Sequence, residues 1–174
     1  MKITETSIPA GSLILSSLER IDFKDAYAVI HSFRKDLTPA DLAKSFFNSM
    51  PQWVNVALII REKIAKLIGL KTADREATQR QLMNFKGEPG ESIALFKVYD
   101  KNENELLTGQ NDTHLDFRLS FFVLRSKSET EIILATVVKL NGLSGKIYFA
   151  IVKPFHKLVV KSIMRRMSRN LIRG

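Results

Sequence analysis

The stretch NDTHLDF, residues 111–117, combines residue types that can do metal or acid–base chemistry. Side chains along an extended strand alternate between two faces, so every second residue shares a face. One face is therefore predicted to carry Asp112, His114, Asp116, Arg118 and Ser120. A carboxylate beside an imidazole can contribute to a divalent-metal site or orient the histidine as a base.

The side chains of this strand face cannot easily bind one metal ion together. Residues two apart on a strand lie about 6.6–7 Å apart at the backbone, so Asp112 and His114 need help from other strands. No second cluster of histidines and carboxylates is placed to help. We predict no metal ion. The remaining interpretations are a structural polar network in which Asp116 pairs with Arg118, a polar lining of a ligand cavity and, last, catalysis.

Two further polar residues are candidates in the C-terminal segment. His156 follows Pro154-Phe155, and a proline inside a helix frees backbone carbonyls that His156 or Lys157 can bind; alternatively, His156 is a polar group at a cavity mouth. The hydroxyl of Tyr148 needs a partner when it is buried. The predicted ligand-binding set is Asp112, His114, Asp116, Arg118, Tyr148 and His156.

The net charge of +9 is unevenly distributed. The chain has 27 Lys plus Arg and 18 Asp plus Glu, and nine of the basic residues follow Glu131, the last acidic residue. An acidic partner for this segment is one interpretation, and a solvated helix face is the other. The predicted partner-binding set is Lys153, Lys157, Lys161, Arg165 and Arg169.

Length and composition indicate one globular domain. The 174 residues are 45% hydrophobic and include no cysteine, which excludes disulfides, thiol nucleophiles and zinc sites with sulfur ligands. No apolar run has the length of a secretory signal core or a membrane span, so we expect a cytoplasmic protein. Phosphate-loop, zinc-protease and nucleophile-elbow motifs are absent, and we predict no cofactor.

The N-terminal half is predicted to form a strand and two short helices. Residues 12–34 mix apolar and polar residues, and Phe23, Tyr27, Val29, Ile30 and Phe33 favour strand. Thr38-Pro39 then opens a helix that Thr38 can cap, and Pro51 opens a second one that ends near Gly69. Residues 71–91 are polar, and KGEPGE at 86–91 is a loop signal.

The C-terminal half is predicted to form antiparallel strands and one long helix. Strands are expected over residues 93–99 and 113–124, and another is expected to begin at Glu105. The apolar segment 130–140 is typical of a central strand. Ser144 is expected to cap a helix with a kink or break near Lys153, caused by Pro154. Beyond the kink, the apolar side is predicted to carry Phe155, Val159, Ile163 and Met167. The fold class is α+β, with a curved antiparallel sheet wrapped around this helix.

Several segments resemble a known family. They are Pro51-Gln52-Trp53 with Arg61 and Gly69-Leu70-Lys71, GQNDTHLDFRLS at 109–120, and GKIYFAIVKPFHKLVVKSIMRRM at 145–167. The chain resembles domain-of-unknown-function (DUF) family 2867, within the SRPBCC, or START-like, superfamily. The resemblance implies one helix-grip domain over 1–174 and no established activity. Related domains occur beside NAD-binding domains, but this chain lacks Gly-x-Gly-x-x-Gly, so no nicotinamide role is expected.

Three functions follow from these observations. Relatives in the superfamily mostly bind apolar ligands between sheet and helix, so the first is a binding module for an apolar or amphipathic small molecule. The second is an interaction protein whose basic C-terminal helix docks on an acidic protein, nucleic acid or anionic lipid. The third is an enzyme of unknown reaction, although no nucleophile–base pair is visible.

Overall fold

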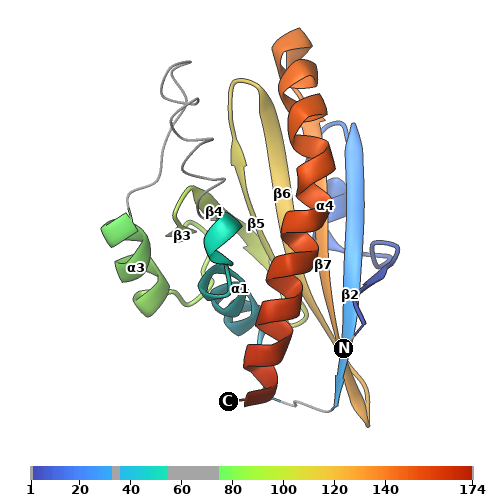
Figure 1. Cartoon of the computed structure of the whole chain (residues 1–174), viewed down its shortest axis with the longest axis vertical. Helices are drawn as coiled ribbons and strands as arrows, with labels where there is room; N and C mark the ends of the chain where they lie inside the picture. The colour runs from blue at the N-terminus through green and yellow to red at the C-terminus, as the bar shows by residue number, and fades with distance from the viewer. Residues whose placement is uncertain (1, 33–35, 55–74, 174) are drawn as a thin grey trace.

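The computed structural model describes residues 2–32, 36–54 and 75–173. Figure 1 shows the chain as a sheet crossed on one face by a long helix. The elements in order are β1 (Thr4–Glu5), the 3-10 helix η1 (Leu13–Ser16), β2 (Phe23–Ser32), α1 (Pro39–Asn48), α3 (Arg75–Asn84), β3 (Ser92–Ile93), β4 (Phe96–Lys101), β5 (Glu105–Asn111), β6 (Leu115–Arg125), β7 (Glu129–Leu140) and α4 (Gly142–Arg173).

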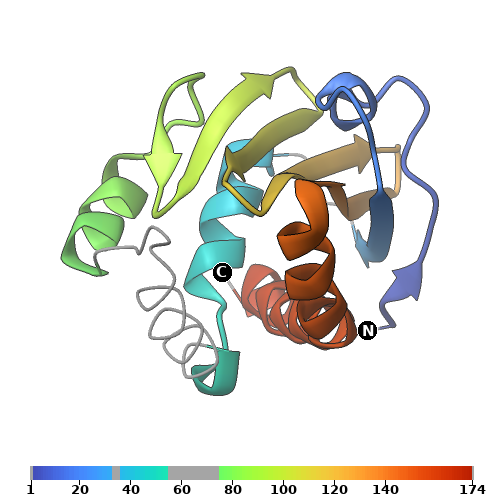
Figure 2. The same cartoon turned by 90° about the horizontal axis from the view of Figure 1, so that it is seen from above.

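The seven strands of the described residues belong to one antiparallel sheet. Their order is β1-β2-β7-β6-β5-β4-β3, so β7 lies between β2 and β6. This position explains why β7 is apolar on both faces, and the prediction of a central strand at 130–140 is confirmed. The sheet curves around α4, as Figure 2 shows from above. The predicted α+β architecture, with a curved antiparallel sheet around a long C-terminal helix, is therefore confirmed.

Local capping chemistry fixes the start of α1. The Thr38 hydroxyl accepts from the Asp41 backbone N–H at 3.1 Å, and the Asp41 carboxylate accepts from the Thr38 N–H at 3.3 Å. This reciprocal pair satisfies two backbone donors at the helix start, and Pro39 suits the first helical position. The predicted helix is confirmed, and it buries Leu42 and Phe46 against the concave face of the sheet.

The long helix α4 runs through Pro154 without a break. It begins at Gly142, so its N-cap position is Asn141, three residues before the predicted Ser144. Of the kink or break predicted near Lys153, the break is not observed. Ile163 and Met167 are buried as predicted, but Phe155 is 60% exposed. Phe155 therefore lies on a different side of the helix from these core residues.

Two clusters of buried apolar residues cover the two faces of the sheet. The concave cluster joins the sheet to α1 and α4 and includes Leu42, Phe121 and Met164. The convex cluster packs the segment around η1 against the sheet and includes Ile14 and Ile133. Burial on both faces holds the segment around η1 on the side of the sheet opposite α4.

A buried glutamate fixes η1 to the convex face. Glu105 is 0% exposed, and one of its carboxyl oxygens accepts from the hydroxyls of Ser12 at 2.7 Å and Ser120 at 2.5 Å. The other oxygen accepts from the Leu13 backbone N–H at 2.8 Å. A buried polar group is tolerated when it is hydrogen-bonded, and here three donors meet that requirement.

Other sequence predictions need correction. Within residues 12–34, η1 precedes β2, and the predicted strand residues Phe23, Tyr27, Val29 and Ile30 belong to β2. No helix was predicted within residues 71–91, but α3 lies there, before the predicted loop at KGEPGE. The predicted strand 93–99 is interrupted at Ala94, which has a φ of 55°. Gln52–Val54 are helical, and the rest of the predicted second helix, residues 55–69, lies outside the described residues.

Replacement of Glu105 should destabilise the whole domain. Glu105→Ala leaves two hydroxyls and one backbone N–H buried without their acceptor, so we expect the free energy of unfolding to fall by about 3 kcal/mol or more. Urea unfolding followed by circular dichroism measures this loss. Glu103→Ala, at an exposed neighbouring turn position, is the control and should change stability by no more than about 0.5 kcal/mol. Equal stability of the two variants would contradict this account of Glu105.

Candidate functional site

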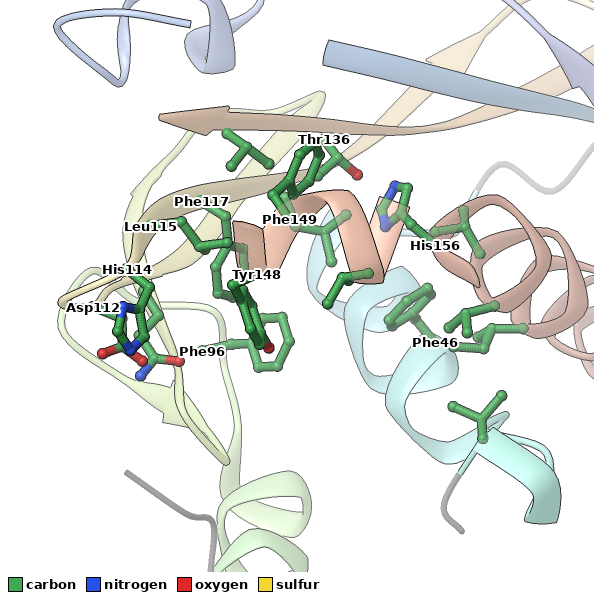
Figure 3. A pocket seen from close by; sticks show the side chains of 18 of the residues that line it. Phe46, Phe96, Asp112, His114, Leu115, Phe117, Thr136, Tyr148, Phe149 and His156 are labelled. Carbon is green, nitrogen blue, oxygen red and sulfur yellow. The ribbon is translucent and has the colours of Figure 1, made fainter. Parts of the chain in front are cut away.

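A pocket of about 300 Å³ lies between the concave face of the sheet, α1 and α4. Most of its lining is apolar, as Figure 3 shows. From β6 the lining includes Leu115, Phe117 and Leu119, from α1 Phe46, and from α4 Phe149, Val152, Val160 and Ile163. Its polar lining residues are Gln110, Asp112, His114, Thr136, Tyr148 and His156.

The strand register explains the floor of the pocket. Phe117 of β6 pairs with Val138 of β7, and Leu119 pairs with Thr136. Directly opposite residues in antiparallel strands point to the same face, so these two pairs form a continuous apolar surface interrupted only by the Thr136 hydroxyl. The pocket therefore uses the apolar face of β6.

This geometry corrects the predicted polar face of the strand at 113–124. Asp112 and His114 precede β6, in the turn after β5, and they line the pocket together with the apolar residues. Asp116 and Arg118 belong to β6 and alternate with its apolar set, so they lie on the convex face and outside the pocket lining. The predicted set of six ligand-binding residues is thus divided between two faces of the sheet.

Asp112, His114 and Tyr148 gather at one end of the pocket (Figure 3). The His114 ring stacks on Tyr148 with centroids 6.2 Å apart, and its Nδ1 lies 3.1 Å from the Ser144 hydroxyl. All three pocket residues are half-buried, so their polar atoms lie between the apolar interior and solvent. This end can hold the polar group of a molecule whose apolar part fills the cavity.

The start of α4 holds this polar end in place. The Asn141 backbone N–H donates to the His114 carbonyl at 2.9 Å, and the Asn141 side chain donates to the Asp112 carbonyl at 2.9 Å. Gly145, in the first turn of α4, packs so closely on the His114 carbonyl that a Cβ at this position would overlap its oxygen. Only glycine permits this approach of the helix backbone to the turn.

Replacement of Gly145 should therefore disturb both the fold and the polar end. Gly145→Ala pushes α4 away from the turn, and we expect a loss of about 2 kcal/mol or more in the free energy of unfolding. The control is Lys146→Ala at the next, exposed position of the same helix turn, which should stay within about 0.5 kcal/mol of the wild type. Thermal and urea unfolding of both variants check this expectation, which fails if Gly145→Ala is as stable as the control.

A second polar residue of the pocket, His156, contacts a residue that is far away in the sequence. His156 Nε2 lies 3.2 and 3.1 Å from the two carboxylate oxygens of Asp25, on β2. The Tyr27 hydroxyl donates to the same carboxylate at 3.1 Å. Burial raises the pKa of Tyr27, and the adjacent Asp25 carboxylate raises it further. His156 thus binds a side chain of β2 in place of the backbone carbonyls predicted from Pro154.

The two site candidates on the convex face have structural partners. Arg118 is 5% exposed, its guanidinium lies 3.7 Å from the centre of the Tyr99 ring, and its Nη1 donates to Asn111 at 2.8 Å. Burial lowers the pKa of Arg118, although Tyr99 and Asp116 act in the opposite direction. Asp116 lies 3.7 Å from the Lys139 ammonium, so the predicted pairing of Asp116 with Arg118 is replaced by separate contacts.

The basic residues of α4 do not form one row. Lys153, Lys157 and Lys161 lie toward the N-terminal segment and β2: Lys157 pairs with Glu5 at 2.7 Å, and Lys153 and Lys161 lie over the rings of Phe23 and Tyr27 at 5.5 and 5.2 Å. Arg165 and Arg169 are exposed farther along the helix. This distribution follows from the 3.6-residue period, because residues four apart drift around the helix.

The described residues contain neither a metal-binding cluster nor a membrane-spanning helix. Within residues 2–32, 36–54 and 75–173, no three His, Cys, Asp or Glu residues are grouped so that they can hold a metal ion. Among the same residues, no helix is both long and apolar enough to cross a membrane.

The comparisons with known proteins assign the chain to a family. A family model described as a protein of unknown function, DUF2867, matches residues 17–163. The chain belongs to DUF2867. Searches of the curated proteins and of the solved structures return no match. The DUF2867 match runs from before β2 into the second half of α4, so it includes every pocket residue named above.

Proposed function

We propose that this DUF2867 protein binds a small apolar or amphipathic molecule in the pocket between the sheet and α4. The observation that carries the proposal is the pocket itself, which has a volume of about 300 Å³ and a mostly apolar lining contributed by the sheet, α1 and α4. A tightly packed protein interior leaves few voids larger than a water molecule, so a space of this size is a feature that core packing does not explain.

The distribution of polar groups supports an amphipathic ligand. Asp112, His114 and Tyr148 lie together at one end, whereas Thr136 and His156 lie along the side. Binding pockets typically have apolar walls with a few polar groups that orient the ligand. The first group can therefore bind a hydroxyl or amide of the ligand, and the apolar walls can enclose its hydrocarbon part.

We also propose that residues 1–174 form one helix-grip domain of the SRPBCC, or START-like, superfamily. The support is the arrangement of the curved antiparallel sheet around α4, together with the shorter helix α1 at the side of the pocket. In this arrangement the pocket occupies the space between sheet and helix, where the superfamily places apolar ligands.

Filling the pocket should abolish ligand binding without unfolding the protein. Val152→Trp places a large ring in the cavity, so we expect binding of the fluorescent probe 1-aminoanthracene to weaken at least about tenfold. The matched control is Ala150→Trp, an exposed position two residues away on α4, which should bind the probe like the wild type. Fluorescence titration gives the affinities, and circular dichroism confirms folding.

Native mass spectrometry of protein purified gently from cells complements this titration. A discrete additional mass that is lost on denaturation, and that is absent from Val152→Trp, identifies a natural ligand of the pocket. Failure of the wild type to bind the probe, or equal binding by Val152→Trp and Ala150→Trp, would contradict the proposed function.

The polar end should favour ligands that carry a hydroxyl. In displacement of 1-aminoanthracene, we expect 2-naphthol to compete better than naphthalene, because one net hydrogen bond contributes about 1 kcal/mol. In the double variant His114→Ala/Tyr148→Phe, the ratio of the affinities for 2-naphthol and naphthalene should fall about fivefold. The affinity for naphthalene itself should stay the same. A preference that is unchanged in the double variant would show that these side chains do not orient the ligand.

A further inference from the structure

The outer side of α4 carries an unusual row of exposed apolar residues. Large aliphatic and aromatic side chains recur there at steps of four, four, four and three residues, and each is 58–73% exposed. This spacing places them on one side of an α-helix. We call this set the apolar ridge; it consists of Leu143, Ile147, Ile151, Phe155 and Leu158.

The ridge is distinct from the pocket. The pocket-lining residues of α4, such as Phe149, Val152 and Val160, face the sheet, whereas no ridge residue lines the pocket. At 100° per residue, Ile147 and Ile151 lie far around the helix from Phe149 and Val160. The first half of α4 is therefore apolar on two sides, and only one of them is buried within the described part of the chain.

Cations flank the ridge along its length. Lys146, Lys153 and Lys157 are exposed and lie on the side of the helix between the ridge and β2. Farther along α4, Arg165 and Arg169 lie on the same outer side of the helix, seven and eleven residues after Leu158. No acidic residue occurs after Glu131, so α4 contains no carboxylate, and Lys157 pairs instead with Glu5 of β1.

This combination has the properties of a helix that lies in a membrane interface. Such helices insert an apolar side among the acyl chains while Lys and Arg reach the headgroups, and anionic lipids strengthen the binding. An exposed apolar patch on a folded protein commonly marks a protein or membrane contact. The ridge is a convex helix side bordered by cations, which suits a deformable anionic surface better than a preformed protein groove.

We propose that the outer side of α4 docks on an anionic lipid bilayer, with the apolar ridge inserted at the interface and the flanking Lys and Arg residues over the headgroups. The helix lies parallel to the membrane surface in this arrangement, because the ridge extends along its axis. Each ridge residue adds apolar burial, and each flanking cation adds attraction to the anionic headgroups. The proposal concerns a different surface from the pocket and does not depend on the proposed ligand.

Sedimentation with lipid vesicles tests the proposal. The wild type should bind vesicles of phosphatidylcholine with phosphatidylserine and bind much more weakly to phosphatidylcholine alone, and added salt should weaken the binding. Ile147→Ser/Ile151→Ser should reduce partitioning by about tenfold or more, because both side chains then lose their apolar burial. Lys153→Gln/Lys157→Gln should reduce partitioning onto the vesicles on the order of 25-fold, because the loss of each lysine reduces it about fivefold.

Matched variants elsewhere on the molecule serve as controls. Met83→Ser/Leu124→Ser removes exposed apolar side chains from α3 and β6, and Lys97→Gln/Lys127→Gln removes the same charge from β4 and the β6–β7 turn. Both should bind vesicles like the wild type, and the ridge variants should keep their thermal stability and their affinity for 1-aminoanthracene.

Two results would overturn the proposal. The first is the absence of vesicle binding by the wild type, or equal vesicle binding by the ridge and control variants. The second is a concentration-dependent dimer in sedimentation velocity that Ile147→Ser/Ile151→Ser abolishes, because a second copy of the chain would then cover the ridge.

Discussion

The connection between β7 and α4 is the constraint on which the rest of the structure depends. β7 ends at Leu140 and α4 begins at Gly142, so only Asn141 separates the longest strand from the long helix. Asn141 bonds to the turn that carries Asp112 and His114, and this contact directs the helix back across the concave face. The sheet then has to curve around α4, and the space that their side chains leave becomes the pocket.

Much of the fold could be predicted from the sequence because its signals are local. The alternation in β6, the apolar run of β7 and the cap of α1 are each contained within about a dozen residues. For the strand predicted at 113–124, the alternation fails at Asp112 and His114, where a turn precedes β6. The polar helix α3 was not predicted because it lacks the apolar periodicity on which the helix prediction depends.

Other features that were missed, in the candidate site and outside it, arise from contacts between distant segments. His156 and Asp25 are 131 residues apart, and Ser12 and Glu105 are 93 apart. No pattern in a single sequence indicates that such pairs meet, because the sheet topology brings them together. The exposure of Phe155 was missed for a related reason: a helix that is apolar on two sides does not reveal from its sequence which side the sheet covers.

Both apolar sides of α4 belong to one rigid element. Ile151 of the ridge and Val152 of the pocket are adjacent in the chain, so a displacement of the helix that changes the environment of one also moves the other. Two binding events that act on the same two-state element are thermodynamically linked, and the linkage is reciprocal. A molecule in the pocket that shifts α4 would alter the affinity of the outer surface for its partner, and that partner would alter retention of the molecule by the same factor.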